Sequence, residues 1–269
     1  MRTRRGAVDA VDALDVRPFA RLVAAFALAN LVAAQILHEA GHWLVLTATG
    51  RQPVWGITAL VQLWERTPVD PSAWTRFDSP AGDAGWLHVA SLPGSDGEWA
   101  AFIAAGPLAQ IVAIGIGLWL GARSASSSAR TAGVLVAFVN GLTLLLYQVV
   151  GAVRGGGSDE TLLEVYAGVP WSVAAGAFGL AAAAGLVVAT ARLADLRTRA
   201  RWFGAAVLGG LATGPLFAGL QRAIIDGVDR GDPWFAPIMG FSLPVLLLAV
   251  GGAAALAALL RVRGGSERA

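Results

Sequence analysis

The sequence predicts an all-α, polytopic membrane protein with about six transmembrane helices and a small interfacial β-hairpin insertion between the first two helices. Hydrophobic residues make up 56% of the 269 residues, charged residues make up only 14%, and the mean hydropathy is +0.62. This composition is typical of a chain that crosses a bilayer several times. Its apolar segments are about 20 residues or longer, the length that spans the hydrocarbon core of a bilayer. Between the first two segments hydropathy drops over residues 51–97, where five prolines break the chain into short pieces.

The basic residues predict how the chain lies in the membrane. All twenty are arginines, and they flank the apolar segments instead of forming one stripe, so we expect no nucleic-acid partner. With both termini in the cytoplasm, fourteen arginines lie on the inner side and six on the outer side. The cluster Arg192–Arg201 is the firmest local signal. Because cytoplasmic loops carry an excess of arginine, we predict a multi-pass protein of the cell membrane with both termini cytoplasmic.

A polar arm, residues 1–18, precedes the first apolar segment. The first membrane helix is expected over residues 19–48, with Gly50 as its stop. Four polar side chains lie near one face of this helix, and that face must contact protein because lipid cannot satisfy it: Asn30, Gln35, His38 and His42.

Residues 51–97 are expected to form an insertion at the membrane interface. Trp55–Trp64 and Gly85–Leu92 are rich in β-branched and aromatic residues and are separated by turn-forming sequence, a pattern that predicts two strands. Indole rings settle at the membrane interface, and tryptophans recur here: Trp55, Trp64, Trp74, Trp86 and Trp99. We expect the insertion to cover or feed a site in the membrane, by receiving an extended peptide along a sheet edge. An ordinary extramembrane hairpin is the alternative.

The second membrane helix is expected over residues 98–121, opened by a capping box of Ser95 and Glu98. Near its middle are a glycine that allows close backbone approach, a proline that bends the helix and a glutamine that requires a polar partner. These three are candidates for supporting a site: Gly106, Pro107 and Gln110.

The third membrane helix is expected over residues 131–153 and carries Asn140. Three glycines follow, and they allow Asp159 to fold back toward the membrane helices. A short helix is also expected from Ser158 to about residue 167, because serine caps a helix start and acids favour its first turn. Both interpretations hold together, since a capped helix start still presents a carboxylate.

The last part of the chain, residues 166–269, is expected to support the rest. Three membrane helices are predicted there, over residues 171–191, 202–220 and 237–260. They contain no histidine and few acids, which argues against a transporter.

The segment His38-Glu39-Ala40-Gly41-His42 holds two of the three histidines of the chain. On a helix, the spacing of four residues turns both imidazoles to one face, where they form half of a tetrahedral zinc site. Glu39 follows the first histidine and can reach a water at the metal. The alternative is a pair of buried polar residues that bond neighbouring helices. That alternative explains neither the spacing nor the position of Glu39.

A catalytic zinc needs a third protein ligand, and the chain has no cysteine to provide it. We favour Asp159, because it follows the third helix on the side of the membrane where the first helix ends. The remaining candidates are one histidine and three acids near the membrane: His88, Glu98, Glu160 and Glu164.

The chain resembles the site-2 protease family of intramembrane zinc metalloproteases over residues 19–165. Three features carry the resemblance: the histidine motif in the first helix, Ala105-Gly106-Pro107-Leu108-Ala109-Gln110 in the second, and Asn140 followed by Asp159. The resemblance implies one zinc ion on His38, His42 and Asp159. It also implies that Glu39 activates water to hydrolyse a membrane-spanning protein substrate in the lipid bilayer. The resemblance further implies a site near the cytoplasmic face of the membrane, whereas the distribution of the arginines predicts a site near the outer face.

The chain departs from the family pattern at three points. It has no proline between Asn140 and Asp159, Glu160 stands where the family has glycine, and Gln110 stands where asparagine is frequent. Two other functions therefore remain open. One is a catalytically inactive scaffold that binds helical partners, and the other is a metal-dependent lipid hydrolase, which uses the same hydroxide chemistry.

Overall fold

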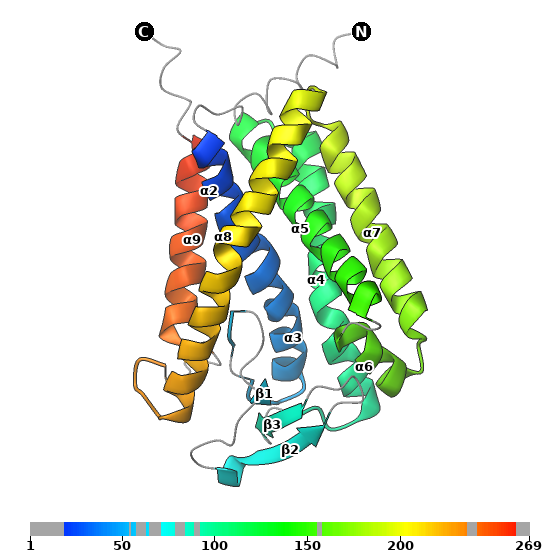
Figure 1. Ribbon diagram of the computed structural model, residues 1–269, viewed down its shortest axis with the longest axis vertical. Coiled ribbons are helices and arrows are strands. Elements are labelled where there is room, and N and C mark those ends of the chain that lie inside the picture. The colour runs from blue at the N-terminus through cyan, green and yellow to red at the C-terminus, as the bar shows by residue number, and fades with distance from the viewer. Residues whose placement is uncertain are drawn as a thin grey trace.

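The computed structural model describes residues 19–53, 55–57, 63–64, 71–78, 84–88, 92–154, 158–235 and 241–261. Six helices in these ranges are long and apolar enough to cross a membrane: Phe19–Ala48, Asp96–Arg123, Ser127–Arg154, Trp171–Ala191, Leu196–Val228 and Leu243–Arg261. They run alternately up and down, with a small sheet at one end of the bundle (Figure 1). The expected all-α polytopic fold with an insertion after the first helix is confirmed. The polar arm, residues 1–18, lies outside the described residues.

The first span consists of three pieces. Helix α2, Phe19–Ala29, continues into a π-helical turn, η1, Asn30–Gln35, and then into α3, Ile36–Ala48. At the start of η1, the Asn30 amide donates to Thr213 Oγ1 at 3.1 Å, and its Oδ1 accepts from Thr143 Oγ1 at 3.4 Å. A π-turn widens the helix locally and is frequent at functional sites. Here it ends three residues before His38, the first residue of the histidine motif.

The insertion forms a three-stranded antiparallel sheet of order β1-β3-β2. Its strands are β1, Leu63–Trp64, β2, Trp74–Asp78, and β3, Ala84–His88, and a short 3₁₀ turn, η2, Pro71–Ala73, precedes β2. The predicted strand over residues 85–92 corresponds to β3. Strand β2 was not predicted, because its arginine, its aspartate and the nearby Pro71 hide the strand pattern.

The predicted strand Trp55–Trp64 is wrong at its beginning. Trp55 and Ile57 are buried with residues of α3, α8 and α9, not in the sheet. The Ile57 amide donates to Gln221 Oε1 at 2.6 Å, and Trp55 forms an isolated parallel bridge with Phe241. This short segment therefore enters the helix bundle, because its apolar side chains find a more complete core there than in a small sheet.

Helices α4, Asp96–Arg123, and α5, Ser127–Arg154, extend beyond the predicted ranges by a few residues at either end. Ser95 accepts from the Glu98 amide at 3.2 Å, which confirms the helix start. The Glu98 carboxylate accepts from the Gly94 amide at 2.6 Å and from Arg51 at 2.7 Å. Glu98 thus caps α4 and ties it to the end of the first span.

The remaining helices are α6, Ser158–Ala167, α7, Trp171–Ala191, α8, Leu196–Asp229, and α9, Leu243–Arg261. Helix α8 begins six residues before the predicted start at residue 202, because Asp195 caps it by accepting from the Thr198 amide at 2.7 Å. This hydrogen bond lowers the pKa of the Asp195 carboxyl. Arginines in the first turns of α8 lower its hydropathy, which hid this start. Of the predicted start of α9, residues 237–240 lie outside the described residues.

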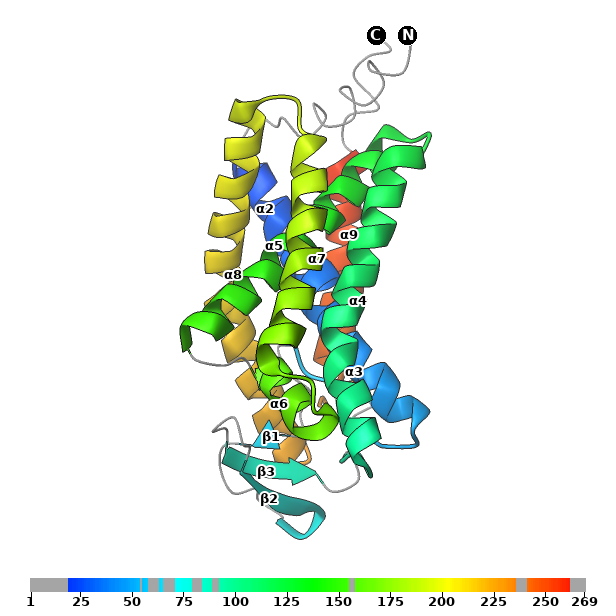
Figure 2. The ribbon, with the colours of Figure 1, turned by 90° about the vertical axis from the view of Figure 1, so that its right-hand side faces the viewer.

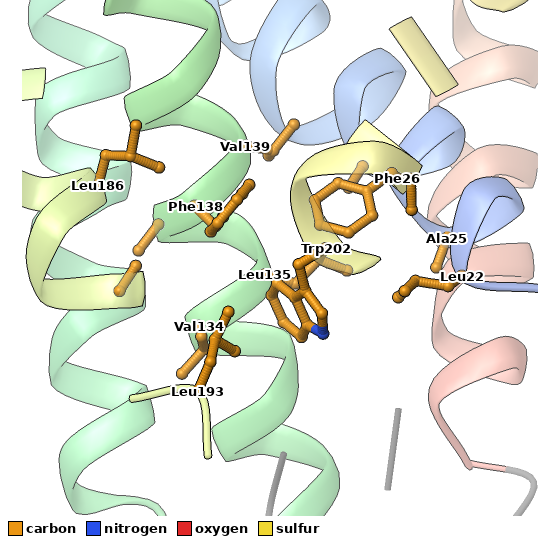
Figure 3. Close-up of a cluster of buried hydrophobic side chains, with 14 of the residues drawn as sticks. Leu22, Ala25, Phe26, Val134, Leu135, Phe138, Val139, Leu186, Leu193 and Trp202 are labelled. Carbon is orange, nitrogen blue, oxygen red and sulfur yellow. The ribbon is translucent and has the colours of Figure 1, made fainter. Parts of the chain in front are cut away.

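The main core lies where α2, α5 and α8 meet. Phe26, Phe138 and Trp202 pack edge to face with ring centroids 5.4–5.5 Å apart, and all three are fully buried (Figure 3). Helices α4 and α7 flank α5, and the short α6 lies between the lower ends of α4 and α7 (Figure 2). This arrangement brings α6 to the end of the bundle at which α3 ends.

Candidate metal centre

His38 and His42 face each other on α3. Their Nε2 atoms are 3.1 Å apart and their ring centroids 4.8 Å apart, in a T-shaped arrangement. The helical spacing of four residues produces this pairing, as expected. Glu39 lies between them in sequence and is 5% exposed. The motif thus places two imidazoles and a carboxylate in the interior of the bundle.

The Nδ1 atoms of both rings are held by α4. His42 Nδ1 donates to the carbonyl oxygen of Phe102 at 2.6 Å. Because a carbonyl only accepts, this nitrogen carries the proton, and the Nε2 of the neutral ring presents a lone pair. His38 Nδ1 pairs with Gln110 Oε1 at 3.1 Å. When both rings are neutral and carry the proton on Nδ1, their Nε2 lone pairs point at one place, an arrangement that a cation stabilises.

Asp159 completes the group from α6. Its Oδ2 lies 3.5 Å from His38 Nε2 and 3.9 Å from His42 Nε2. This oxygen is buried and has no hydrogen-bond partner among the described residues. Burial acts to raise the pKa of the Asp159 carboxyl, but His38 and His42 outweigh this effect and hold the pKa below its usual range. The carboxylate is therefore ionised and directed at the two imidazoles.

These residues fit a divalent metal ion. His38, His42 and Asp159 each offer one ligand atom, and the three atoms lie within 4.8 Å of one another. In a tetrahedral zinc site with bonds of about 2.0–2.1 Å, neighbouring ligand atoms are about 3.3–3.4 Å apart. The observed separations of 3.1, 3.5 and 3.9 Å bracket this value. Two imidazole nitrogens and one buried carboxylate oxygen without a hydrogen-bond partner are ligands of the types that zinc binds.

Two glycines allow α3 and α4 to cross at the site. A Cβ on Gly41 would collide with the carbonyl of Ala105. A Cβ on Gly106 would lie 2.7 Å from Cε1 and Nε2 of His38 and still closer to Nε2 of His42. The predicted close approach at Gly106 is therefore present, and the approaching groups are the two imidazoles. Pro107 is buried beside Gly106 inside α4.

The other predicted site residues lie elsewhere. Asn140 is fully buried in α5, and its amide donates to the carbonyl of Val136 in the same helix at 2.9 Å. Glu164 accepts from the Trp171 amide at 3.0 Å and so caps α7. For His88, the described structure contains only the backbone, which pairs with Trp74 in the sheet.

Glu160 turns away from the metal group. It is 1% exposed, and its Oε1 accepts from Gln148 Nε2 of α5 at 2.7 Å. Burial raises the pKa of this carboxyl, which the hydrogen bond from Gln148 opposes. Glu160 is therefore bonded to α5.

Three contributors had no assigned role in the sequence analysis. The carbonyl of Phe102 acts through the backbone, so its side chain gives no signal. Gln148 is a polar residue in an apolar helix, a pattern that could have indicated a buried partner. The ring of Tyr147 lies 6.4 Å from the ring of His38 and borders the site.

Comparisons with protein-family models, curated proteins and solved structures found no match. The chemistry of the site therefore rests on its own residues.

Proposed function

We propose that this protein is an intramembrane zinc metalloprotease that hydrolyses peptide bonds of membrane-spanning protein substrates, and that it is a divergent member of the site-2 protease family. The observation that carries the proposal is the convergence of His38 Nε2, His42 Nε2 and Asp159 Oδ2 beside the buried Glu39. These ligand atoms come from α3 and α6, which are distant in sequence. If the two histidines were buried only for packing, nothing would place a carboxylate oxygen without a hydrogen-bond partner beside both of them.

Each residue of the site has a task in hydrolysis. His38, His42 and Asp159 would hold one zinc ion, which when bound would supply Lewis-acid chemistry by lowering the pKa of a water to about 7 and polarising a carbonyl. The Phe102 carbonyl and Gln110 fix the imidazole tautomers and raise their basicity. Glu39 accepts the proton of the water and returns it to the leaving amine. The side chains of His38 and Asp159 are 17% exposed, so the site lies in the bundle but stays accessible to a water molecule.

The site lies near one end of the first span. His42 is six residues from the end of α3 at Ala48, which is about 9 Å along the helix. The sheet lies at this end (Figure 1). A peptide bond can therefore reach the site from the membrane interface without crossing the whole bilayer.

Charge supports an orientation with both termini in the cytoplasm of a cell-membrane protein. At the end opposite the sheet, eight arginines of the described residues gather: Arg21, Arg123, Arg130, Arg192, Arg197, Arg199, Arg201 and Arg261. The sheet end carries both acids and arginines, among them Asp96, Glu98, Glu164, Asp226 and Asp232, with Arg51, Arg154, Arg222 and Arg230. Asp195 lies at the arginine-rich end, where it caps α8. Arginines are therefore more numerous at the end opposite the sheet. The positive-inside rule then directs the sheet and the site to the non-cytoplasmic face.

The lack of native cysteines makes this orientation directly testable. Ala125→Cys lies at the arginine-rich end and Pro233→Cys at the sheet end, both at exposed positions. In intact cells, a membrane-impermeant maleimide is expected to label only Pro233→Cys, and labelling of Ala125→Cys alone would reverse the orientation.

The proposed activity is tested on detergent-purified protein with an internally quenched peptide that contains one membrane-spanning segment. We expect zinc-dependent cleavage by the wild type and none by Glu39→Gln, although that variant retains its zinc, because an amide cannot accept the proton. Cleavage by Glu39→Gln at the wild-type rate would overturn the assignment. Zinc-loaded protein that releases fatty acid from added phospholipid instead would indicate a lipid hydrolase, and turnover of neither probe would favour the scaffold.

A further inference from the structure

We propose that the buried hydrogen bond between Gln148 and Glu160 positions Asp159 as a metal ligand. Gln148 and Glu160 are then positioning residues of the metal centre, and this inference rests on the proposed zinc site. Neither residue is one of the three candidate ligands, which are His38, His42 and Asp159. Their role is to fix the first turn of α6, from which Asp159 projects.

The bond joins two helices across a short connection. Gln148 lies about one and a half turns before the end of α5, and Glu160 lies in the first turn of α6. Gln148 Nε2 donates to Glu160 Oε1 at 2.7 Å, and both side chains are buried, with 6% and 1% of their surface exposed. A buried hydrogen bond to a carboxylate is stronger than one between neutral groups, and loss of the donor leaves the acceptor unsatisfied.

Two consecutive acids of α6 bind two different helices. Neighbouring residues on a helix project about 100° apart, so Asp159 and Glu160 leave the first turn in different directions. Asp159 points to the imidazoles on α3, while Glu160 points to Gln148 on α5. Rotation or withdrawal of this turn would break the bond to Gln148 and move Asp159 from the imidazoles at the same time.

The rest of α6 is anchored further from the ligand. Leu163 is buried against Ile103 and Ala174, and the Tyr166 ring stacks on Trp99 with centroids 4.8 Å apart. These contacts hold the helix one to two turns after Asp159. The bond from Gln148 acts one residue from Asp159 and therefore controls the direction of that carboxylate more directly.

The expected effect follows from the geometry that zinc requires. Metal–ligand distances vary by only about 0.2 Å, and loss of an outer-shell partner typically weakens metal binding about 10- to 100-fold. A first turn released from α5 no longer presents Asp159 Oδ2 at a fixed distance from the imidazoles. We expect a fall of this size when either partner of the bond is removed.

The test uses the full chain in detergent. Zinc affinity is measured by competition with a chelator, and the visible absorption of the Co²⁺-substituted protein reports the ligand geometry. Glu160→Ala and Gln148→Ala are each expected to lower zinc affinity about 10- to 100-fold, and the double variant no further, because both remove the same bond. Glu160→Gln retains an oxygen acceptor for Gln148 and is expected to stay close to the wild type. Asp96→Ala, a change of an exposed acid in the first turn of α4, is the matched control.

The outcomes separate this inference from the proposed function. Wild-type zinc affinity and an unchanged Co²⁺ spectrum in Gln148→Ala and Glu160→Ala, with loss of zinc in Asp159→Ala, would overturn the inference alone. Unchanged zinc binding in Asp159→Ala would overturn the proposed site. A lower metal-free melting temperature with an unchanged Co²⁺ spectrum would show a purely structural bond and also overturn the inference. If Glu160→Ala does not fold, Gln148→Met replaces it in the comparison.

Discussion

Substitution of Gly106 by alanine is the most direct way to disturb the site through its packing. The added Cβ would lie 2.7 Å from Cε1 and Nε2 of His38 and still closer to Nε2 of His42. Atoms in van der Waals contact are about 3.5 Å apart, so a ring or the α4 backbone must shift by about 0.8 Å or more. This shift exceeds the roughly 0.2 Å over which metal–ligand distances vary.

The expected cost has two parts. Overpacking of this kind destabilises a folded protein by about 1–3 kcal/mol. Loss of one outer-shell partner weakens zinc binding about 10- to 100-fold. Displacement of two ligands is expected to weaken it by at least as much. Gly115→Ala is the matched control in the same helix, because no neighbouring atom of the described residues lies within 4 Å of its added Cβ. We expect this control to bind zinc normally and to melt at the wild-type temperature or slightly above it, since alanine favours helix.

The assay combines chelator competition for zinc with thermal melting of the metal-free protein. Gly106→Ala is expected to lose affinity in the first measurement and stability in the second. Wild-type zinc affinity in Gly106→Ala would refute the crossing of α3 and α4 at the two imidazoles.

Three further predictions concern contacts around the site and at a helix start. Gln110→Leu removes the partner of His38 Nδ1, so the zinc affinity measured by chelator competition should fall about 10- to 100-fold. Gln110→Glu keeps an acceptor and should lose less zinc affinity. Equal losses of affinity in the two variants would contradict the contact. Arg51→Ala removes an ion pair with Glu98 that is about one-third exposed, so the unfolding free energy in denaturant titration should fall by less than about 1 kcal/mol, with zinc content unchanged. The stabilisation by ionised Asp195 should be complete above its unfolded pKa of about 3.9 and be lost as pH falls through its lower folded pKa. The melting-temperature difference between wild type and Asp195→Asn should therefore be constant near neutral pH and shrink below pH of about 4, whereas a constant difference at every pH would contradict the cap.

Hydropathy predicted the membrane helices for two reasons. A segment that crosses lipid must expose apolar side chains to it, and it must satisfy its backbone hydrogen bonds internally, which a helix does. Hydropathy failed at the start of α8, where arginines lower it and the deciding signal is the local cap Asp195. It also failed for Trp55 and Ile57, which are buried against α3, α8 and α9 instead of pairing in the sheet. Such packing depends on distant helices, which no local pattern contains.

The histidine motif was predictable because helical spacing alone places both rings on one face. The choice of Asp159 required only that the third helix return the chain to the same end of the bundle. The roles of the Phe102 carbonyl and Gln148 were not predictable, since each depends on how two helices approach one another. Asn140 was predicted to support the site, but its amide bonds to its own helix.

The central claim is that His38, His42 and Asp159 together bind zinc, and the zinc content of purified protein tests it most directly. Wild-type protein offered zinc and then freed of loosely bound metal is expected to retain about one ion per chain. His38→Ala and Asp159→Ala should each lose it, and His88→Ala, which changes the third histidine, should keep it. Wild-type protein that retains no zinc, or Asp159→Ala that retains as much as the wild type, would contradict the account.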